Sequence, residues 1–206
     1  MLTHSVRGDA LLASVKRGGG SYKGPWYNVY TLAAGAVICE ALLHGIVTLQ
    51  GGRLVPGPHG GVGSLGQLVE RIREEPKPLA IKEWLERTGP WARQAIEAEL
   101  AEAGLAEGRV IRILLGTDER LKILNQAAQD QVFATVHDVA SGKRAATVEE
   151  ALLVLLLGSA AMLQYHVRTM RGRRPRRIVR TLTEMLPRDV EEARSVYKRW
   201  DIAPPS

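Results

Sequence analysis

The densest chemistry in this sequence is a run of guanidinium groups in the last quarter of the chain. The stretch VRTMRGRRPRRIVR carries seven arginines, and residues 151–183 contain no Asp or Glu. Guanidinium groups bind phosphate through paired hydrogen bonds, and like charges at this density repel one another unless an anionic partner relieves them. The run therefore predicts an anion-binding segment, whose candidate ligands are Arg171, Arg173, Arg174, Arg176 and Arg177.

The anion could belong to a membrane or to a nucleic acid. Near an anionic bilayer each basic residue contributes about 1 kcal/mol, so several arginines could hold a protein there reversibly. A nucleic-acid-binding regulator using residues 168–180 is the alternative, although neither a helix-turn-helix nor a basic sheet with interleaved aromatics is evident. A solvated basic loop without a partner is the third interpretation. We favour the membrane surface over nucleic acid.

A second candidate for membrane contact is the segment KRGGGSYKGPWY at residues 16–27. Lys16, Arg17 and Lys23 surround aromatic side chains, among them Trp26. Amphipathic aromatics beside basic residues are typical of a membrane interface. Trp26 could equally pack into the core, and the sequence leaves both alternatives open.

Other kinds of site lack their required residues. The five histidines are scattered, without a partner at metal-ligand spacing, and Cys39 falls on the apolar side of an expected helix. GVGSLG at 61–66 matches a dinucleotide-binding pattern, but Pro56 and Pro58 interrupt the approach where a parallel strand is required. Paired carboxylates fall on charged helix faces. We therefore expect no catalytic residue, no metal and no cofactor, and hence no enzyme.

The elements that position these residues are mostly helices. The 206 residues contain 45% hydrophobic but only 5% aromatic residues, which suits packed helices rich in Leu, Val, Ile and Ala. We predict a mainly α fold over residues 1–206: a single compact helical domain with one or two small β-hairpins. The expected hairpins cover residues 46–57 and 109–124. The expected helices cover residues 8–15, 30–44, 64–74, 79–87, 90–103, 127–139, 148–163 and 188–199.

Capping signals support several of these limits. Ser64 with Gln67 and Thr147 with Glu150 have the spacing of capping boxes. Gly45 and Gly104 stand where helices are expected to end, and Pro90 where one is expected to begin.

Compartment and membrane topology follow from shorter signals. The apolar run at 151–163 is shorter than the roughly 20 residues of a membrane span, so it predicts a buried core helix. The first residues lack the pattern of a signal peptide, and we see no lipidation motif. A single cysteine fits a reducing compartment. We expect a cytoplasmic protein that associates with membranes peripherally.

The order of the segments resembles the Golgi phosphoprotein 3 family from about residue 8 to 200. LAAGAVICEALLHGIVTLQGGRL (32–54) is similar to the small-residue helix and strand pair of this family. GSLGQLVERIREEPKPLAIKEWLERTG (63–89) resembles its next helix, basic-proline break and Trp-bearing helix, and AIEAELAEAGLAEG (95–108) the lead into its hairpin. The late apolar helix and arginine run resemble bacterial relatives.

The resemblance implies a helical protein without known catalytic chemistry. Eukaryotic members bind phosphatidylinositol 4-phosphate through a Trp and several Arg, hold cytoplasmic tails of glycosyltransferases, and self-associate through the hairpin. The lipid-binding Trp falls within one residue of Trp26, and one Arg of an Arg-x-x-Arg pair at Arg93. Its first Arg is replaced by Pro90, with Arg87 one turn earlier, and another expected Arg by Ala34. These departures suit a bacterial chain, whose ligands would be other anionic lipids. The resemblance further implies cytoplasmic tails of membrane proteins as partners, and a homo-oligomer.

Overall fold

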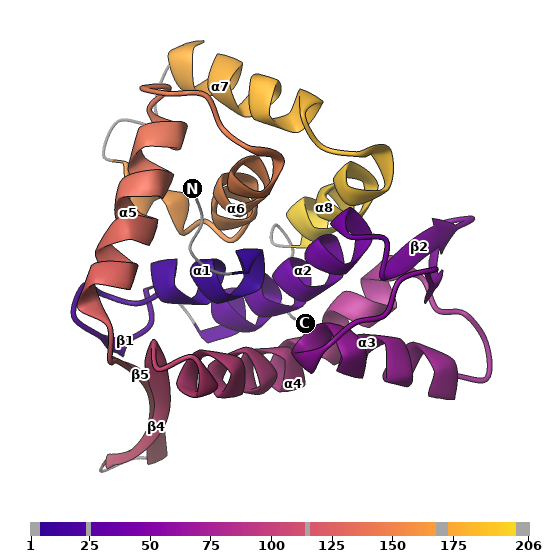
Figure 1. The fold of residues 1–206 in the computed structure, drawn as a ribbon, viewed down its shortest axis with the longest axis horizontal. Helices are drawn as coiled ribbons and strands as arrows, with labels where there is room; N and C mark the ends of the chain where they lie inside the picture. Colours follow the sequence, from indigo (N-terminus) through magenta and orange to yellow (C-terminus); the bar gives the residue numbers. More distant parts are fainter. Residues whose placement is uncertain (1–4, 24–25, 114–115, 168–172, 201–206) are drawn as a thin grey trace.

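The chain folds into a helical body with two small antiparallel sheets (Figure 1). The structure, a computed structural model, describes residues 5–23, 26–113, 116–167 and 173–200, with the backbone alone at 26, 112–113, 116–119, 173–175 and 197–200. The helices are α1 (Val6–Ala13), α2 (Trp26–Leu43), α3 (Gly63–Glu74), α4 (Ile81–Glu102), α5 (Gln126–Ala140), α6 (Val148–Ser159), α7 (Arg173–Glu184) and α8 (Arg188–Trp200), with a short 3₁₀ helix η1 (Leu163–Tyr165).

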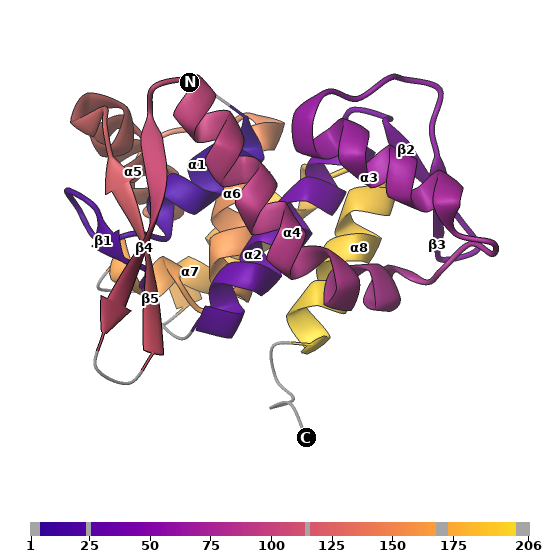
Figure 2. The same ribbon diagram turned by 90° about the horizontal axis from the view of Figure 1, so that it is seen from below.

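Helix α2 runs through the centre of the molecule (Figures 1 and 2). Its residues from Asn28 to Leu42 are buried except for the partly buried Tyr30, because the other helices cover it on all sides. Helix α4 packs along it, and α1, α6 and α8 complete the surrounding layer. A helix that is apolar all round is expected at such a position. The predicted mainly α fold is confirmed.

The sheets connect distant parts of the chain. Strands β2 (Val47–Gln50) and β3 (Arg53–Pro56) form the predicted hairpin, whose turn glycines Gly51 and Gly52 both have positive φ. Strands β4 (Ala106–Ile113) and β5 (Gly116–Ile123) form the second hairpin, and β1 (Gly20–Ser21) pairs with β5. We expected GTDE at 116–119 to be the turn, but these residues lie within β5.

Helix α4 is continuous through Pro90, where we had predicted two helices. Proline removes one backbone hydrogen bond at a cost of about 3 kcal/mol, but the buried face continues on both sides from Trp84 to Ile96. Close packing on α2 offsets the loss: a Cβ at Gly89 would lie 3.0 Å from Cβ of Tyr30. Tertiary contact therefore overrides the local break.

Several other predicted helix ends are confirmed. Gly45 and Gly104 follow α2 and α4 with φ of 65° and 68°, and the Thr147–Glu150 capping box opens α6. Helix α6 ends at Ser159, four residues earlier than predicted, because the chain turns at Ala161, whose φ is 52°. The Arg-rich segment, for which a solvated loop was one of three interpretations, is helical from Arg173 onward. Its apolar Ile178, Val179 and Leu182 pack inward and provide the reason.

Candidate membrane-binding surface

Trp26 is the first residue of α2, and its side chain lies outside the described part of the structure. One turn later, the ring of Tyr30 lies 5.4 Å from the guanidinium carbon of Arg93. Nη1 of Arg93 lies 2.5 Å from Glu97 Oε1, which also accepts a hydrogen bond from the Tyr22 hydroxyl. The structure therefore brings Arg93 to the Trp26 end of α2, where Arg93 is buried and its charge is compensated by Glu97.

Arg87 lies apart from Arg93. Its guanidinium forms an ion pair of 2.7 Å with Glu75, and its side chain is half exposed. The two arginines are six positions apart on α4, which places them on different faces of the helix. Arg87 therefore does not join the cluster at the start of α2.

One hydrogen bond and one close polar contact bring the start of α2 and the preceding Lys23 to the segment that precedes the arginine run. The side-chain nitrogen Nδ2 of Asn28 donates a hydrogen bond of 3.1 Å to the carbonyl oxygen of Ala160. Lys23 Nζ lies 3.3 Å from His166 Nε2 and 4.1 Å from the centroid of the Phe133 ring. The end of the 16–27 segment and the residues that precede the arginine run thus lie in one region of the molecule.

Helix α7 presents part of the arginine run to solvent. The side chains of Arg176 and Arg177 are exposed, and Arg180 forms an exposed ion pair with Glu184. Arg171 lies outside the described residues, as do the side chains of Arg173 and Arg174, which begin α7.

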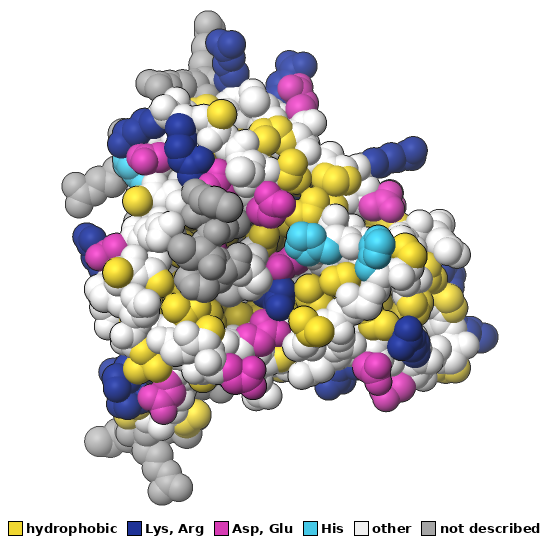
Figure 3. Space-filling model, viewed as in Figure 1, with side chains coloured by type: hydrophobic (Ala, Val, Ile, Leu, Met, Phe, Trp, Pro, Cys, Tyr) yellow, Lys and Arg dark blue, Asp and Glu magenta, His cyan; other side chains and the backbone are white. Residues whose placement is uncertain are grey.

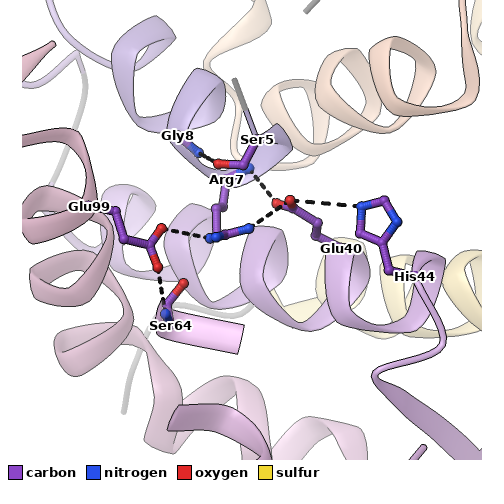
Figure 4. Close-up of polar contacts among 7 residues, drawn as sticks. All are labelled: Ser5, Arg7, Gly8, Glu40, His44, Ser64 and Glu99. Carbon is purple, nitrogen blue, oxygen red and sulfur yellow. Dashed lines mark hydrogen bonds and ion pairs between the residues drawn. The ribbon is translucent and has the colours of Figure 1, made fainter. Parts of the chain in front are cut away.

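A buried charge cluster at the centre of the molecule was not predicted from the sequence (Figure 4). Arg7 of α1 lies between two carboxylates, with Nη1 2.7 Å from Glu40 Oε1 and Nε 2.8 Å from Glu99 Oε2. Glu40 also accepts from the backbone nitrogen of Arg7, and His44 lies 4.0 Å from it. The sequence signal is an acidic residue, Glu40, within an otherwise apolar helix. The cluster joins α1, α2 and α4.

Glu99 also explains the GVGSLG segment. Its Oε1 accepts a hydrogen bond from the backbone nitrogen of Ser64 in the first turn of α3. The predicted Ser64–Gln67 capping box is therefore wrong, because Ser64 is already inside the helix and Val62 is the N-cap residue. A Cβ at Gly63 would clash with Glu99. The glycine admits a carboxylate of the protein itself at the helix N-terminus, where a dinucleotide site would hold a phosphate.

The described residues offer neither a metal site nor a membrane-spanning helix. No group of three or more His, Cys, Asp or Glu side chains in the described part of the chain could hold a metal ion. None of the helices, over the residues described, is long and apolar enough to cross a membrane. Cys39 is buried, as predicted, and burial raises the pKa of its thiol to about 12.

Comparison with known proteins assigns the family. A search of curated proteins gives no match. The family model described as Golgi phosphoprotein 3 (GPP34) matches residues 9–196, which include every helix except the first residues of α1 and the end of α8. The match covers most of the 206 residues and agrees with the resemblance in the order of the segments. The chain therefore belongs to the Golgi phosphoprotein 3 family.

Proposed function

We propose that the protein is a non-enzymatic, peripheral membrane protein that binds anionic phospholipid head groups. The observation that carries the proposal is the juxtaposition of the Trp26 end of α2 with the segment leading into the arginine run, through Lys23–His166 and Asn28–Ala160. Aromatic and basic residues gathered in one region suit a membrane interface. Phosphatidylinositol 4-phosphate, the ligand of eukaryotic family members, belongs to this class of lipid.

The orientation on the membrane follows from the arrangement of the elements. The first turn of α2, the end of α8 and the far end of the β4–β5 hairpin lie on the lower side in Figure 2. The opposite side, seen in Figure 3, mixes acidic with basic side chains. An anionic bilayer attracts a basic surface and repels carboxylates. We propose that the side bearing the first turn of α2, close to Lys23 and to the segment leading into the arginine run, faces the membrane.

The proposed role is that of a cytoplasmic adaptor. Arg7 and Glu40 are buried, and Arg7 pairs with carboxylates of α2 and α4, so this proposal gives the Arg7–Glu40–Glu99 cluster a structural role. Val110 and Ile111 of β4 are exposed apolar residues, which supports self-association through the hairpin. Cytoplasmic tails of membrane proteins are the further partners that the family suggests.

Co-sedimentation with liposomes tests the proposal. Anionic liposomes should bind the protein at low salt, neutral liposomes should not, and added salt should weaken binding. Replacing Arg173, Arg174, Arg176 and Arg177 with Ala should cost about 4 kcal/mol, or roughly three orders of magnitude in partitioning.

A charge-matched control separates position from net charge. Arg53, Arg73, Lys77 and Lys82 are exposed and lie on β3, on α3, in the segment after α3 and on α4. Their replacement with Ala also removes four positive charges and should leave most of the binding intact. Equal losses in both variants would refute a specific role for α7. Binding to DNA with a steep salt dependence, without binding to lipid, would instead support the nucleic-acid alternative.

A further inference from the structure

A partly open cavity of about 320 Å³ lies between the second half of α6, η1, α7 and α8. Its apolar walls come from Val154 and Leu155 of α6, Leu163 of η1 and Val179 of α7. Arg194 of α8 is the one charged residue among the described residues that line it. Ligand pockets span about 300–1,000 Å³ and are mostly apolar, so this cavity has the size of a small one.

The charge of Arg194 is already compensated within the protein. Its Nε and Nη2 atoms form hydrogen bonds of 2.6 and 2.7 Å with the two carboxylate oxygens of Glu191. Its Nη1 lies 3.4 Å from the hydroxyl of Ser159, which also lines the cavity. The interior is therefore close to neutral, and it suits hydrocarbon better than a free anion.

The rim of the cavity differs from its interior. Arg176 precedes Val179 by one turn of α7, and residues three apart on a helix are neighbours on its surface. Arg176 is exposed, and no ion pair to it is found within the described residues. Gln164, which is exposed at η1, adds a hydrogen-bonding group. An anionic head group is thus complementary to the rim, while an apolar chain is complementary to the walls.

The cavity also lies beside the start of α2. Ser159 and Ala161 line it, and the carbonyl of the intervening Ala160 accepts the hydrogen bond from Asn28 in the first turn of α2. This is the end of α2 that the proposed function turns toward the membrane. The cavity volume is at the lower end of the range for ligand sites, which fits one hydrocarbon chain rather than two.

We infer that this cavity binds one hydrocarbon chain of an anionic lipid, whose head group lies against Arg176. The inference rests on the proposed function, because it names the part of the lipid that enters the protein. The hydrocarbon chain contributes affinity because each methylene group that enters the cavity is removed from water. Arginines on α7 then select the charge of the head group.

Gly158 offers a way to fill the cavity without removing a core contact. It lines the cavity from within α6, and a Cβ there would lie 3.6 Å from Cδ2 of Leu163, an ordinary contact. Gly158→Leu also raises helix propensity, so the variant is expected to fold. Gly158→Met is a second, unbranched filler. Ala98→Leu, at an exposed position of α4, is the control for an added leucine elsewhere.

Calorimetric titration with dodecyl phosphate below its micelle concentration tests the inference on the full chain. The wild type and Ala98→Leu should bind one molecule each, and both Gly158 variants should bind about tenfold more weakly or worse. Inorganic phosphate should not compete. Arg176→Gln should weaken dodecyl phosphate more than dodecyl maltoside, which has the same chain and a neutral head.

The opposite results overturn the inference: no binding to the wild type, equal binding to the Gly158 variants, or full competition by inorganic phosphate. Liposome sedimentation of the same proteins keeps the two proposals separate. If the wild type binds anionic liposomes but not dodecyl phosphate, the cavity inference fails and the proposed function stands. If it binds dodecyl phosphate but no liposome, the proposed function fails and the cavity remains a chain-binding site.

Discussion

The Nζ atom of Lys23 lies 3.3 Å from Nε2 of His166, although the two residues are 143 positions apart in the chain. The Phe133 ring packs against both, with its centroid 4.1 Å from Nζ and 4.9 Å from the imidazole centroid. Burial lowers the pKa of Lys23 to about 8. Burial, and then the positive charge of Lys23, lowers the pKa of His166 to about 4. This contact therefore requires a neutral imidazole.

In mild acid, His166 should make a destabilising contribution, which opposes the stabilising contribution of protonated Asp9. The unfolded chain takes up a proton on this imidazole near pH 6.5, whereas the folded chain does so only near pH 4. The contribution of His166 to the free energy of unfolding is expected to drop by up to about 3 kcal/mol across this window. His137, whose Nδ1 lies 3.3 Å from the His166 carbonyl, and Lys23 both oppose protonation. Urea unfolding at several pH values measures the drop.

His166→Gln should remove this part of the pH dependence, because glutamine keeps a neutral polar group at the position. His59→Gln is the matched control, since His59 is exposed. A wild-type slope retained in His166→Gln would contradict the assignment.

Replacing Glu99 with Gln should destabilise the fold by about 2 to 4 kcal/mol. One carboxylate oxygen of Glu99 accepts a hydrogen bond from Arg7 Nε, and the other accepts one from the Ser64 backbone nitrogen. The side-chain amide of glutamine has a single oxygen, so it cannot replace both acceptors. Glu102→Gln, at an exposed position one turn later on α4, should change stability by no more than about 0.5 kcal/mol. Chemical denaturation compares the two. Similar small losses would mean that Glu99 is dispensable for α3.

Asp9 should give a pH dependence of opposite sign. Burial, and then the negative charge of Glu40, raises its pKa from 3.8 to about 7. The folded chain therefore holds a proton that the unfolded chain releases, and stability falls by up to about 4 kcal/mol as the pH rises between these values. Asp9→Asn should flatten this part of the curve. Curves for wild type and variant that run parallel from pH 4 to pH 7 would exclude Asp9 as the cause.

Ala161→Gly should stabilise the protein by about 1 kcal/mol, because the left-handed conformation costs an alanine about that much and a glycine nothing. The φ of Ala161 is 52°, and it follows the end of α6 at a position where helices commonly carry glycine. Ala98→Gly, inside α4, should instead lose about 1 kcal/mol. Thermal unfolding distinguishes the two signs. A loss of stability in Ala161→Gly would show that its methyl group packs usefully.

Local sequence determined much of the fold. Apolar residues at helical spacing predicted α2, and the glycines at 45, 51, 52 and 104 predicted helix ends and a hairpin turn where positive φ is found. The local sequence pattern was insufficient where tertiary packing outweighed the backbone preference of single residues. Pro90 predicted the start of a helix, but packing against α2 keeps α4 continuous through this residue. The arginine run left a solvated loop open as one interpretation, yet Ile178, Val179 and Leu182 hold the segment as α7 against the core.

The candidate surface divides in the same way. The sequence by itself determined which segments carry basic and aromatic residues, because those properties belong to single side chains. Only the tertiary structure decided that Arg93 is compensated by Glu97, that Arg87 stands apart, and that Lys23 meets His166. It also created the Arg7–Glu40–Glu99 cluster and the cavity beside α7. Burial and charge pairing depend on groups far apart in the chain, and no local pattern encodes that proximity.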